Sequence, residues 1–413
     1  MDGLRVALLT YRGNPFVGGQ GIYIRNLSRE LHRAGHQVTV LAGPPYPMLD
    51  DGVRLVELPS LDLYREPDPF RIPRWGEYRD WIDALEVGVM MTAGFPEPLT
   101  FSLRARRWLA RADKYFDVVH DNQCLGYGLL GLRLPLVTTV HHPIQVDREI
   151  DLAAATGSRR ISLRRWYGFT AMQRRVARRL RHVITVSGAS AAQITEHLAV
   201  PAERLNIVPV GADIHLFSPS PSLARVPGRV VTTASADVPI KGLAILVEAI
   251  AKISTERTVQ LVVIGNAKRG SPVHKLVDRH GLAGAVEFVG RLSTEEVADY
   301  VRSAELAVVP SLFEGFSLPA IEAMACATPL VATTGGALPE VVGPDGHAAL
   351  LVPPGDPQAL AAAIGRVLDD PDLGTRLGTA GRERVVTQFT WRAAADRTAA
   401  VYRQAIAEHG DRG

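Results

Sequence analysis

Two glutamates, Glu314 and Glu322, lie eight positions apart in a segment whose pattern predicts a strand, a loop and a helix. Leu306–Pro310 is an apolar run of strand length, and Pro319 suits the first turn of a helix, where its missing N–H is not needed. We therefore expect Glu314 in the loop and Glu322 about one turn into the helix. A carboxylate accepts two hydrogen bonds side by side, which matches the vicinal hydroxyls of a ribose or a hexose. Two carboxylates at this spacing can hold the two ends of a nucleotide sugar.

Donors for an anion stand beside these acids. The N–H groups of Gly315–Ser317 follow the first glutamate and can point at an anion or at sugar hydroxyls. Lys241, one of only five lysines, is predicted to open a helix after the strand Val230–Thr233, where it can neutralise a diphosphate. Each group also has an ordinary alternative: an acid at a helix N-terminus, an exposed helix residue, or a solvated lysine.

Three further features are candidates. The loop Gly18–Gly21 has part of a dinucleotide-binding pattern, but Ile24 stands where the last glycine is required. His141 ends a predicted strand. Thr334–Glu340 is another strand-to-helix loop, in which glycine exposes the backbone. Glycines equally make tight turns, and a strand-end histidine is as often a satisfied structural residue.

Other motifs are missing. The sequence contains no G-x-x-x-x-G-K-[ST] segment and no Cys/His spacing suited to zinc. Asp370-Pro-Asp372 has the D-x-D spacing of metal-dependent sugar transferases, but its proline and its position after a helix favour a turn. The sequence therefore predicts no metal site.

The elements that position these residues alternate as strand, loop and helix in both halves of the chain. Apolar runs without polar alternation indicate parallel strands covered by helices on both faces. A Ser/Pro-rich stretch near 215–228 predicts a linker. We therefore expect an α/β protein with two doubly wound domains, 1–215 and 216–390, and a helix at 391–413 that packs back toward the first domain. Ligands of such sheets bind at the carboxyl ends of the strands.

Bulk composition limits the function classes. The 413 residues carry a net charge of only +3, which does not argue for nucleic acid, although 41 of the 46 basic residues are arginine. Two cysteines make no disulfide framework, no secretory signal is visible, and no apolar run reaches the ~20 residues that span a bilayer. These features predict a cytoplasmic enzyme.

These residues resemble those of a known family. The motif E-x7-E in SLFEGFSLPAIEAMA, followed by GGALPE, is similar to that of the retaining glycosyltransferases of family 4, and the resemblance covers essentially the whole chain. Supporting matches are Gly18-Gly19, His141, Val186-Ser187 and Pro209–Asp213. The resemblance implies the two-domain GT-B fold, with two Rossmann-like domains facing a cleft and C-terminal helices closing the structure.

The resemblance also implies roles. In that family the first glutamate contacts the donor sugar, the second contacts the ribose hydroxyls, and the lysine that matches Lys241 binds the diphosphate. The implied catalytic residues are His141, Lys241 and Glu314. The donor-binding set includes Lys241 and Glu314 and adds Gly18, Gly19, Arg269, Arg291, Gly315, Phe316, Ser317, Leu318 and Glu322.

Two positions depart from the family pattern. The arginine usual five residues before the lysine is Ala236, which removes one diphosphate cation, and the usual asparagine of the inter-domain segment is Val210. Arg269 follows a predicted strand and is a candidate replacement. Arg291 is a candidate near the nucleotide base, with a surface arginine as the alternative.

The function implied is transfer of a hexose, with retention and without a metal or other cofactor, from a nucleoside-diphosphate sugar to a hydroxyl of a glycan, lipid or small molecule. Alternatives on the same fold are a sugar-nucleotide epimerase, a phosphorylase, or an inactive partner subunit. The nine arginines of Arg159–Arg181 suggest a further contact, with an anionic membrane surface, and their alternative is a solvated face. Within that stretch we expect Arg174, Arg178 and Arg181 to share one helical face.

Overall fold

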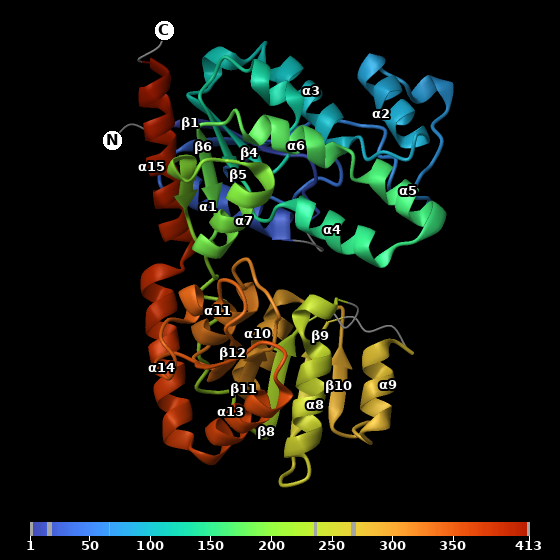
Figure 1. Ribbon diagram of the computed structural model, residues 1–413. Helices are drawn as coiled ribbons and strands as arrows, with labels where there is room; N and C mark the ends of the chain where they lie inside the picture. Colours follow the sequence, from blue (N-terminus) through green and yellow to red (C-terminus); the bar gives the residue numbers. More distant parts are fainter. Residues whose placement is uncertain (1–2, 15–18, 66, 235–237, 266–269, 411–413) are drawn as a thin grey trace. The chain divides into compact units, whose positions relative to one another are not determined.

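The computed structural model describes residues 3–14, 19–65, 67–234, 238–265 and 270–410, and the chain forms two compact units. The first unit contains residues up to Val186, Ser190–Val208 and the C-terminal residues from Ala394, and the second contains Ser187–Ala189 and Pro209–Ala393. Each unit has its own parallel sheet, as Figure 1 shows. The prediction of an α/β chain with two doubly wound units is confirmed.

The first unit is built on a seven-stranded sheet in the order β3-β2-β1-β4-β5-β6-β7, with every neighbouring pair parallel. Its strands are β1 (Arg5–Thr10), β2 (Gln37–Ala42), β3 (Arg54–Glu57), β4 (Val118–Asn122), β5 (Leu136–Thr139), β6 (His182–Thr185) and β7 (Leu205–Ile207). Its helices are α1 (Gly19–Arg33), α2 (Trp81–Met91), α3 (Glu97–Leu109), α4 (Ile144–Ala154), α5 (Gly157–Trp166), α6 (Phe169–Ala177), most of α7 (Gly188–Leu198) and most of α15 (Trp391–Gly410), with one-turn 3-10 helices at Trp75–Glu77, Asp113–Tyr115, Tyr127–Gly131 and Ala202–Arg204.

The second unit has a six-stranded parallel sheet in the order β10-β9-β8-β11-β12-β13. Its strands are β8 (Val226–Thr233), β9 (Gln260–Ile264), β10 (Val286–Val289), β11 (Ala304–Val309), β12 (Leu330–Thr333) and β13 (Leu350–Val352). Its helices are α8 (Leu243–Ile253), α9 (Pro272–Arg279), α10 (Thr294–Ser303), α11 (Leu318–Ala325), α12 (Leu338–Val342), α13 (Pro357–Asp369) and α14 (Pro371–Gln388), with a 3-10 helix at Pro239–Lys241.

Helices cover these sheets through continuous apolar faces. In α8, Leu243, Leu246, Val247 and Ile250 are buried at the i, i+3, i+4, i+7 spacing, against β8, β9 and α13. The predicted capping box of α10 is present, because Ser293 Oγ accepts from Glu296 N and Glu296 accepts from Ser293 N. Both cysteines are free and buried.

Three local predictions need correction. Lys241 does not open a helix but ends a 3-10 turn, because Gly242 takes a left-handed φ of 68° before α8 begins. Asp370 is not in a simple turn; it caps α14 by accepting from Leu373 N, and Asp372 lies in the first turn of that helix. Helix α6 ends at Ala177, so Arg181 does not extend its arginine face.

Candidate functional site

Glu314 lies in the loop that follows β11, with an exposed fraction of 7%. Its Oε1 accepts from Lys241 Nζ at 2.8 Å and from Ser311 Oγ at 2.7 Å, and its Oε2 accepts from Lys241 Nζ at 3.0 Å. The lysine comes from the loop after β8, the strand beside β11. The two charged residues predicted from sequence thus meet at the carboxyl end of the second sheet.

A glycine lets these two loops approach. Leu312 N donates to Ile240 O at 2.8 Å, so the chain before Lys241 is tied to the Glu314 loop. A Cβ added at Gly242 would lie 1.9 Å from Pro310 O, closer than any real contact. With its φ of 68°, this position favours glycine both for its backbone conformation and for the space it leaves.

A pair of glycines supports Glu314 from the other side. The residue forms an isolated parallel bridge with Gly336, and its carbonyl accepts from Ala337 N at 2.8 Å. A Cβ at Gly336 would lie 2.3 Å from Glu314 O, and one at Gly335 would lie 2.6 Å from Leu312 O. The expectation that glycine leaves this backbone exposed is wrong at Gly335, which is buried because it packs against the Glu314 loop.

Helix α11 begins directly after Glu314. Ser317 has a φ of 96° and caps the helix, because its Oγ accepts from Ala320 N. Phe316 is buried with its ring edge-to-face on Phe389, at 5.6 Å between centroids. Gly315 O accepts from Ser187 Oγ at 2.6 Å. The segment Gly315–Leu318 is therefore a turn next to the Lys241–Glu314 pair, and these contacts hold its conformation.

Glu322 lies on α11, as the sequence predicts. It is partly buried, and desolvation raises the pKa of its carboxyl to about 7. A hydroxyl-bearing ligand that donates hydrogen bonds to this group would replace the hydration that burial removes.

Arg291 is a further candidate of the second unit that the structure describes. Arg291 is exposed after β10, with a left-handed φ of 59°. Since β10 is two strands from β8, roughly 10 Å separate its strand end from that of Lys241. Arg269 and Ala236 lie outside the described residues, as does Gly18 of the first unit.

In the first unit, His141 follows β5 and Gly19 begins α1. His141 Nε2 lies 2.8 Å from Asn122 Oδ1, and its ring meets the Tyr23 ring edge-to-face at 4.5 Å between centroids. Burial lowers the pKa of His141 to about 4, so the imidazole is neutral at physiological pH.

Comparison with known proteins decides the family. Residues 17–216 match the model of Glycosyltransferase Family 4, and residues 227–370 match that of Glycosyl transferases group 1. The chain is 53% identical to an MMP alpha-(1->4)-mannosyltransferase of Mycolicibacterium hassiacum, over 98% of this chain and 99% of that protein. The chain is a family 4 glycosyltransferase.

Solved structures agree with the fold of this glycosyltransferase. A sucrose-phosphate synthase from Thermosynechococcus elongatus is 27% identical, with a TM-score of 0.73 over 98% of this chain and all of that one. HepE of Anabaena, in complex with UDP-glucose, is 18% identical, with a TM-score of 0.68 over 97% of this chain and all of that one. The predicted GT-B class is confirmed at the level of a two-domain α/β fold.

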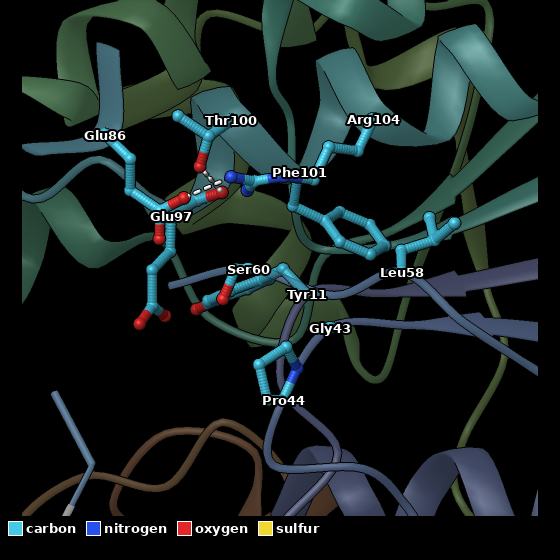
Figure 2. Close-up of a pocket in the computed structure, with 10 residues that line it drawn as sticks. All are labelled: Tyr11, Gly43, Pro44, Leu58, Ser60, Glu86, Glu97, Thr100, Phe101 and Arg104. Atoms are coloured by element: carbon cyan, nitrogen blue, oxygen red, sulfur yellow. Dashed lines mark hydrogen bonds and ion pairs between the residues drawn. The ribbon is translucent and has the colours of Figure 1, made fainter. Parts of the chain in front are cut away.

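The first unit of the glycosyltransferase has a small pocket at the carboxyl ends of β1–β3 (Figure 2). Glu86 pairs with Arg104 in its wall, and Glu97 pairs with Arg12 at 2.6 Å. Desolvation raises the pKa of Glu97 to about 7 and also raises that of Glu86. The other lining residues are Tyr11, Gly43, Pro44, Leu58, Ser60, Thr100 and Phe101.

The arginine-rich stretch lines a wider hollow in the same unit. Its volume is about 700 Å³, and α4, α6 and α7 contribute to its walls together with Arg164 and Tyr167. Four more arginines line it: Arg148, Arg174, Arg175 and Arg178. Among the described residues, no helix is both long and apolar enough to cross a bilayer.

Several residues near the candidate sites were not predicted from the sequence. Ser311 was included only as part of the loop, although it bonds Glu314. Asn122 bonds His141, and Glu86, Glu97 and Arg104 form the small pocket. The acids of α2 and α3 had no readable signal, because helical acids are usually solvated and only the fold buries these.

Proposed function

We propose that this glycosyltransferase moves a hexose from a nucleoside-diphosphate sugar to a hydroxyl acceptor, with retention of configuration. The observation that carries the proposal is the pair formed by Lys241 and Glu314, a cation and an acid at the ends of adjacent parallel strands. Ligands of such sheets bind at these strand ends. A donor of this class carries both a diphosphate and hydroxyls, and so offers a partner to each residue.

Donor binding redistributes the partners of this pair. Lys241, whose side chain is 36% exposed, turns its ammonium to the diphosphate, and Glu314 accepts from hydroxyls of the hexose. Glu322 accepts from the ribose hydroxyls, and the N–H groups of Gly315–Ser317 add donors near the phosphates. The ammonium stays paired in this exchange, because the diphosphate takes the place of the Glu314 carboxylate while the hydroxyls of the hexose become partners of Glu314.

The chemical step then needs no covalent intermediate. The acceptor oxygen bonds to the anomeric carbon on the face from which the nucleotide departs, while the bond from that carbon to the phosphate oxygen breaks. The acceptor proton passes to the departing phosphate. Lys241 and the loop amides stabilise the diphosphate charge as it develops. We expect transfer to persist after chelation with EDTA, and loss of activity that Mg²⁺ restores would contradict this.

The sugar and the acceptor are assigned by class. Mannose is the first hexose to test, because the relative that is 53% identical is named a mannosyltransferase. We assign the acceptor to the first unit, whose strand-end pocket is lined by Ser60, Glu86 and Glu97, polar groups that can accept hydrogen bonds from acceptor hydroxyls. His141 would contact the donor sugar or shape the acceptor side.

The alternatives differ in what they consume. An epimerase changes the donor without an acceptor, and a phosphorylase uses inorganic phosphate in place of the acceptor. A binding panel of UDP, GDP and ADP, followed by their hexose derivatives, identifies the donor. Product analysis by NMR with an oligomannoside acceptor then reports the linkage and its anomeric configuration. A β-linked product from an α-linked donor, or turnover only with phosphate, would overturn the proposal.

A further inference from the structure

The imidazole of His141 has a buried partner at Nε2. Asn122 ends β4, the strand beside β5, and is fully buried. Asn122 Oδ1 faces His141 Nε2, while Asn122 Nδ2 is buried without a hydrogen-bond partner among the described residues. An amide oxygen only accepts, so in this orientation the proton of the neutral imidazole lies on Nε2. His141 Nδ1 has no hydrogen-bond partner within the described part of the chain. Nδ1 therefore has a free lone pair that can accept a hydrogen bond from a ligand.

The backbone beside the ring is held as tightly. Gln123 is buried in a left-handed conformation, with a φ of 55°. Its Oε1 accepts from His141 N at 2.7 Å and from His142 N at 3.4 Å, and its Nε2 donates to His142 O at 2.6 Å. A non-glycine residue in this region costs of order 1–3 kcal/mol and persists only where the surroundings fix it. Here the amide clamp provides that fixation.

The ring is also fixed in rotation. Tyr23 presses its ring against the imidazole, and the Tyr23 hydroxyl lies 3.1 Å from Thr139 Oγ1. Thr139 Oγ1 in turn lies 2.7 Å from His120 Nε2, while Tyr402 Oη lies 2.6 Å from His120 Nδ1. Burial lowers the pKa of His120 to about 3, so this chain is neutral as well. The C-terminal helix thus supports the orientation of a residue in the β5 loop.

We propose that Asn122 is a positioning residue that fixes His141 as its neutral Nε2–H tautomer, leaving Nδ1 to accept a hydrogen bond from a substrate hydroxyl. Gln123 holds the backbone of the loop in register for this contact. The inference rests on the proposed function, and it deepens that function. A neutral nitrogen with a free lone pair can accept a hydrogen bond from a sugar hydroxyl. It cannot form a hydrogen bond with an unprotonated phosphate oxygen, because that oxygen is also an acceptor.

Asn122→Asp tests the assignment through the pH profile. At low pH a carboxylate beside Nε2 stabilises the imidazolium, and a neutral carboxyl would donate to Nε2, so in both cases Nδ1 becomes an N–H. At higher pH the carboxylate accepts from Nε2–H and Nδ1 is bare again. The pKa of His141 rises from about 4 toward its ordinary ~6.5. We expect kcat/KM of Asn122→Asp to be about tenfold lower at pH 5.5 than at pH 7.5, beyond any change in the wild type. Asn206→Asp places a carboxylate on β7 and is the matched control.

Asn122→Leu removes the hydrogen bond without adding charge. We expect kcat/KM to fall about three- to tenfold, as for the loss of one neutral hydrogen bond, with nucleotide-diphosphate affinity unchanged. His142→Ala is a control on the neighbouring ring, whose Nε2 pairs with Asp147 at 3.1 Å. A variant in which nucleotide affinity falls together with kcat/KM would indicate general disruption and overturn the positioning role.

The tautomer can be measured without activity. In a protein labelled with ¹⁵N-histidine, the signals lost in His141→Ala identify the ring, and a bare nitrogen resonates well downfield of a protonated one. We expect a bare Nδ1 and a protonated Nε2 in the wild type at pH 7. A protonated Nδ1 would overturn the inference. Failure of transfer with every nucleotide sugar would overturn the proposed function and leave this assignment standing.

Discussion

The loops after β11 and after β5 position a candidate residue by different means. Glu314 is held by a charge, because Lys241 reaches it across two strand ends, and by glycines that let neighbouring backbone approach. His141 is held by neutral groups, with Asn122 on its ring nitrogen and Gln123 on its backbone. The first arrangement suits a ligand that brings its own charge. The second suits selection among hydroxyls.

The difference also explains what each loop tolerates. An ion pair can open when a diphosphate offers the lysine a better partner, so the Glu314 loop combines a fixed backbone with exchangeable side-chain contacts. The His141 loop has no charge to exchange, and its contacts must remain in place while the ligand binds. Variants of the two loops should therefore fail differently.

The largest effect should come from the charged pair. Removing Lys241 or Glu314 deletes a charge-assisted hydrogen bond of ~1.5–3 kcal/mol to the donor, so kcat/KM should fall roughly 10- to 100-fold or more in Lys241→Ala and Glu314→Ala. The effect of Lys241→Ala should be at the upper end, because Ala236 removes the other expected diphosphate cation. Steady-state kinetics check both, and Lys252→Ala on α8 is the control. Near-wild-type turnover in folded Glu314→Ala would contradict the site.

Gly242→Ala should destabilise the second unit. The left-handed backbone alone costs of order 1–3 kcal/mol, and contact with Pro310 O adds to that. Gly281→Ala is a matched control, because Gly281 has a nearly equal φ of 67° with nothing within 4 Å of an added Cβ. Denaturant unfolding should show the larger loss of stability for Gly242→Ala. Equal losses would mean that close packing of the two loops contributes nothing.

Donor affinity should rise with pH through Glu322. Its folded-state pKa is raised to about 7, so the carboxyl is protonated below this pH and accepts ribose hydroxyls fully only above it. The same shift works against the fold, because ionising this group above its ordinary pKa lowers the free energy of unfolding up to about pH 7. Donor affinity should increase up to about tenfold between pH 6 and pH 8, as followed by calorimetry. In Glu322→Gln this part of the dependence should be absent.

The smallest effect concerns the arginine hollow of the first unit. If an anionic membrane is its partner, each arginine near the surface contributes ~1 kcal/mol, or about fivefold in binding. Arg174→Glu and Arg178→Glu should then weaken co-sedimentation with phosphatidylglycerol vesicles. Arg366→Glu, at an exposed position of α13, should not. Wild-type binding that ignores the anionic lipid content would remove the membrane from the list of partners.

The sequence predicted the second unit's strand ends well because its signals are local. Glu314, Pro319 and Glu322 lie within nine residues, and the apolar strand and the proline alone place them on a loop and a helix. Lys241 was predicted in the right loop but the wrong conformation, because a left-handed Gly242 leaves no periodic signal.

The first unit was less predictable for the same reason. Asn122 and Gln123 lie 18 or 19 residues before His141, and only the pairing of β4 with β5 brings them beside it. Tyr402 lies 282 residues from His120, and no pattern in either segment indicates their contact. Partners joined by sheet register or by a returning terminal helix need the fold itself before they can be named.

The bridge between Glu314 and Gly336 joins the loops after β11 and β12 into one structural unit. If the E-x7-E segment is grafted from a relative, the first glutamate loses the backbone contacts that hold its loop, unless the Gly335–Ala337 turn is transferred with it. Designers who wish to exchange donor preference between members of this family should treat the two loops as one exchangeable module.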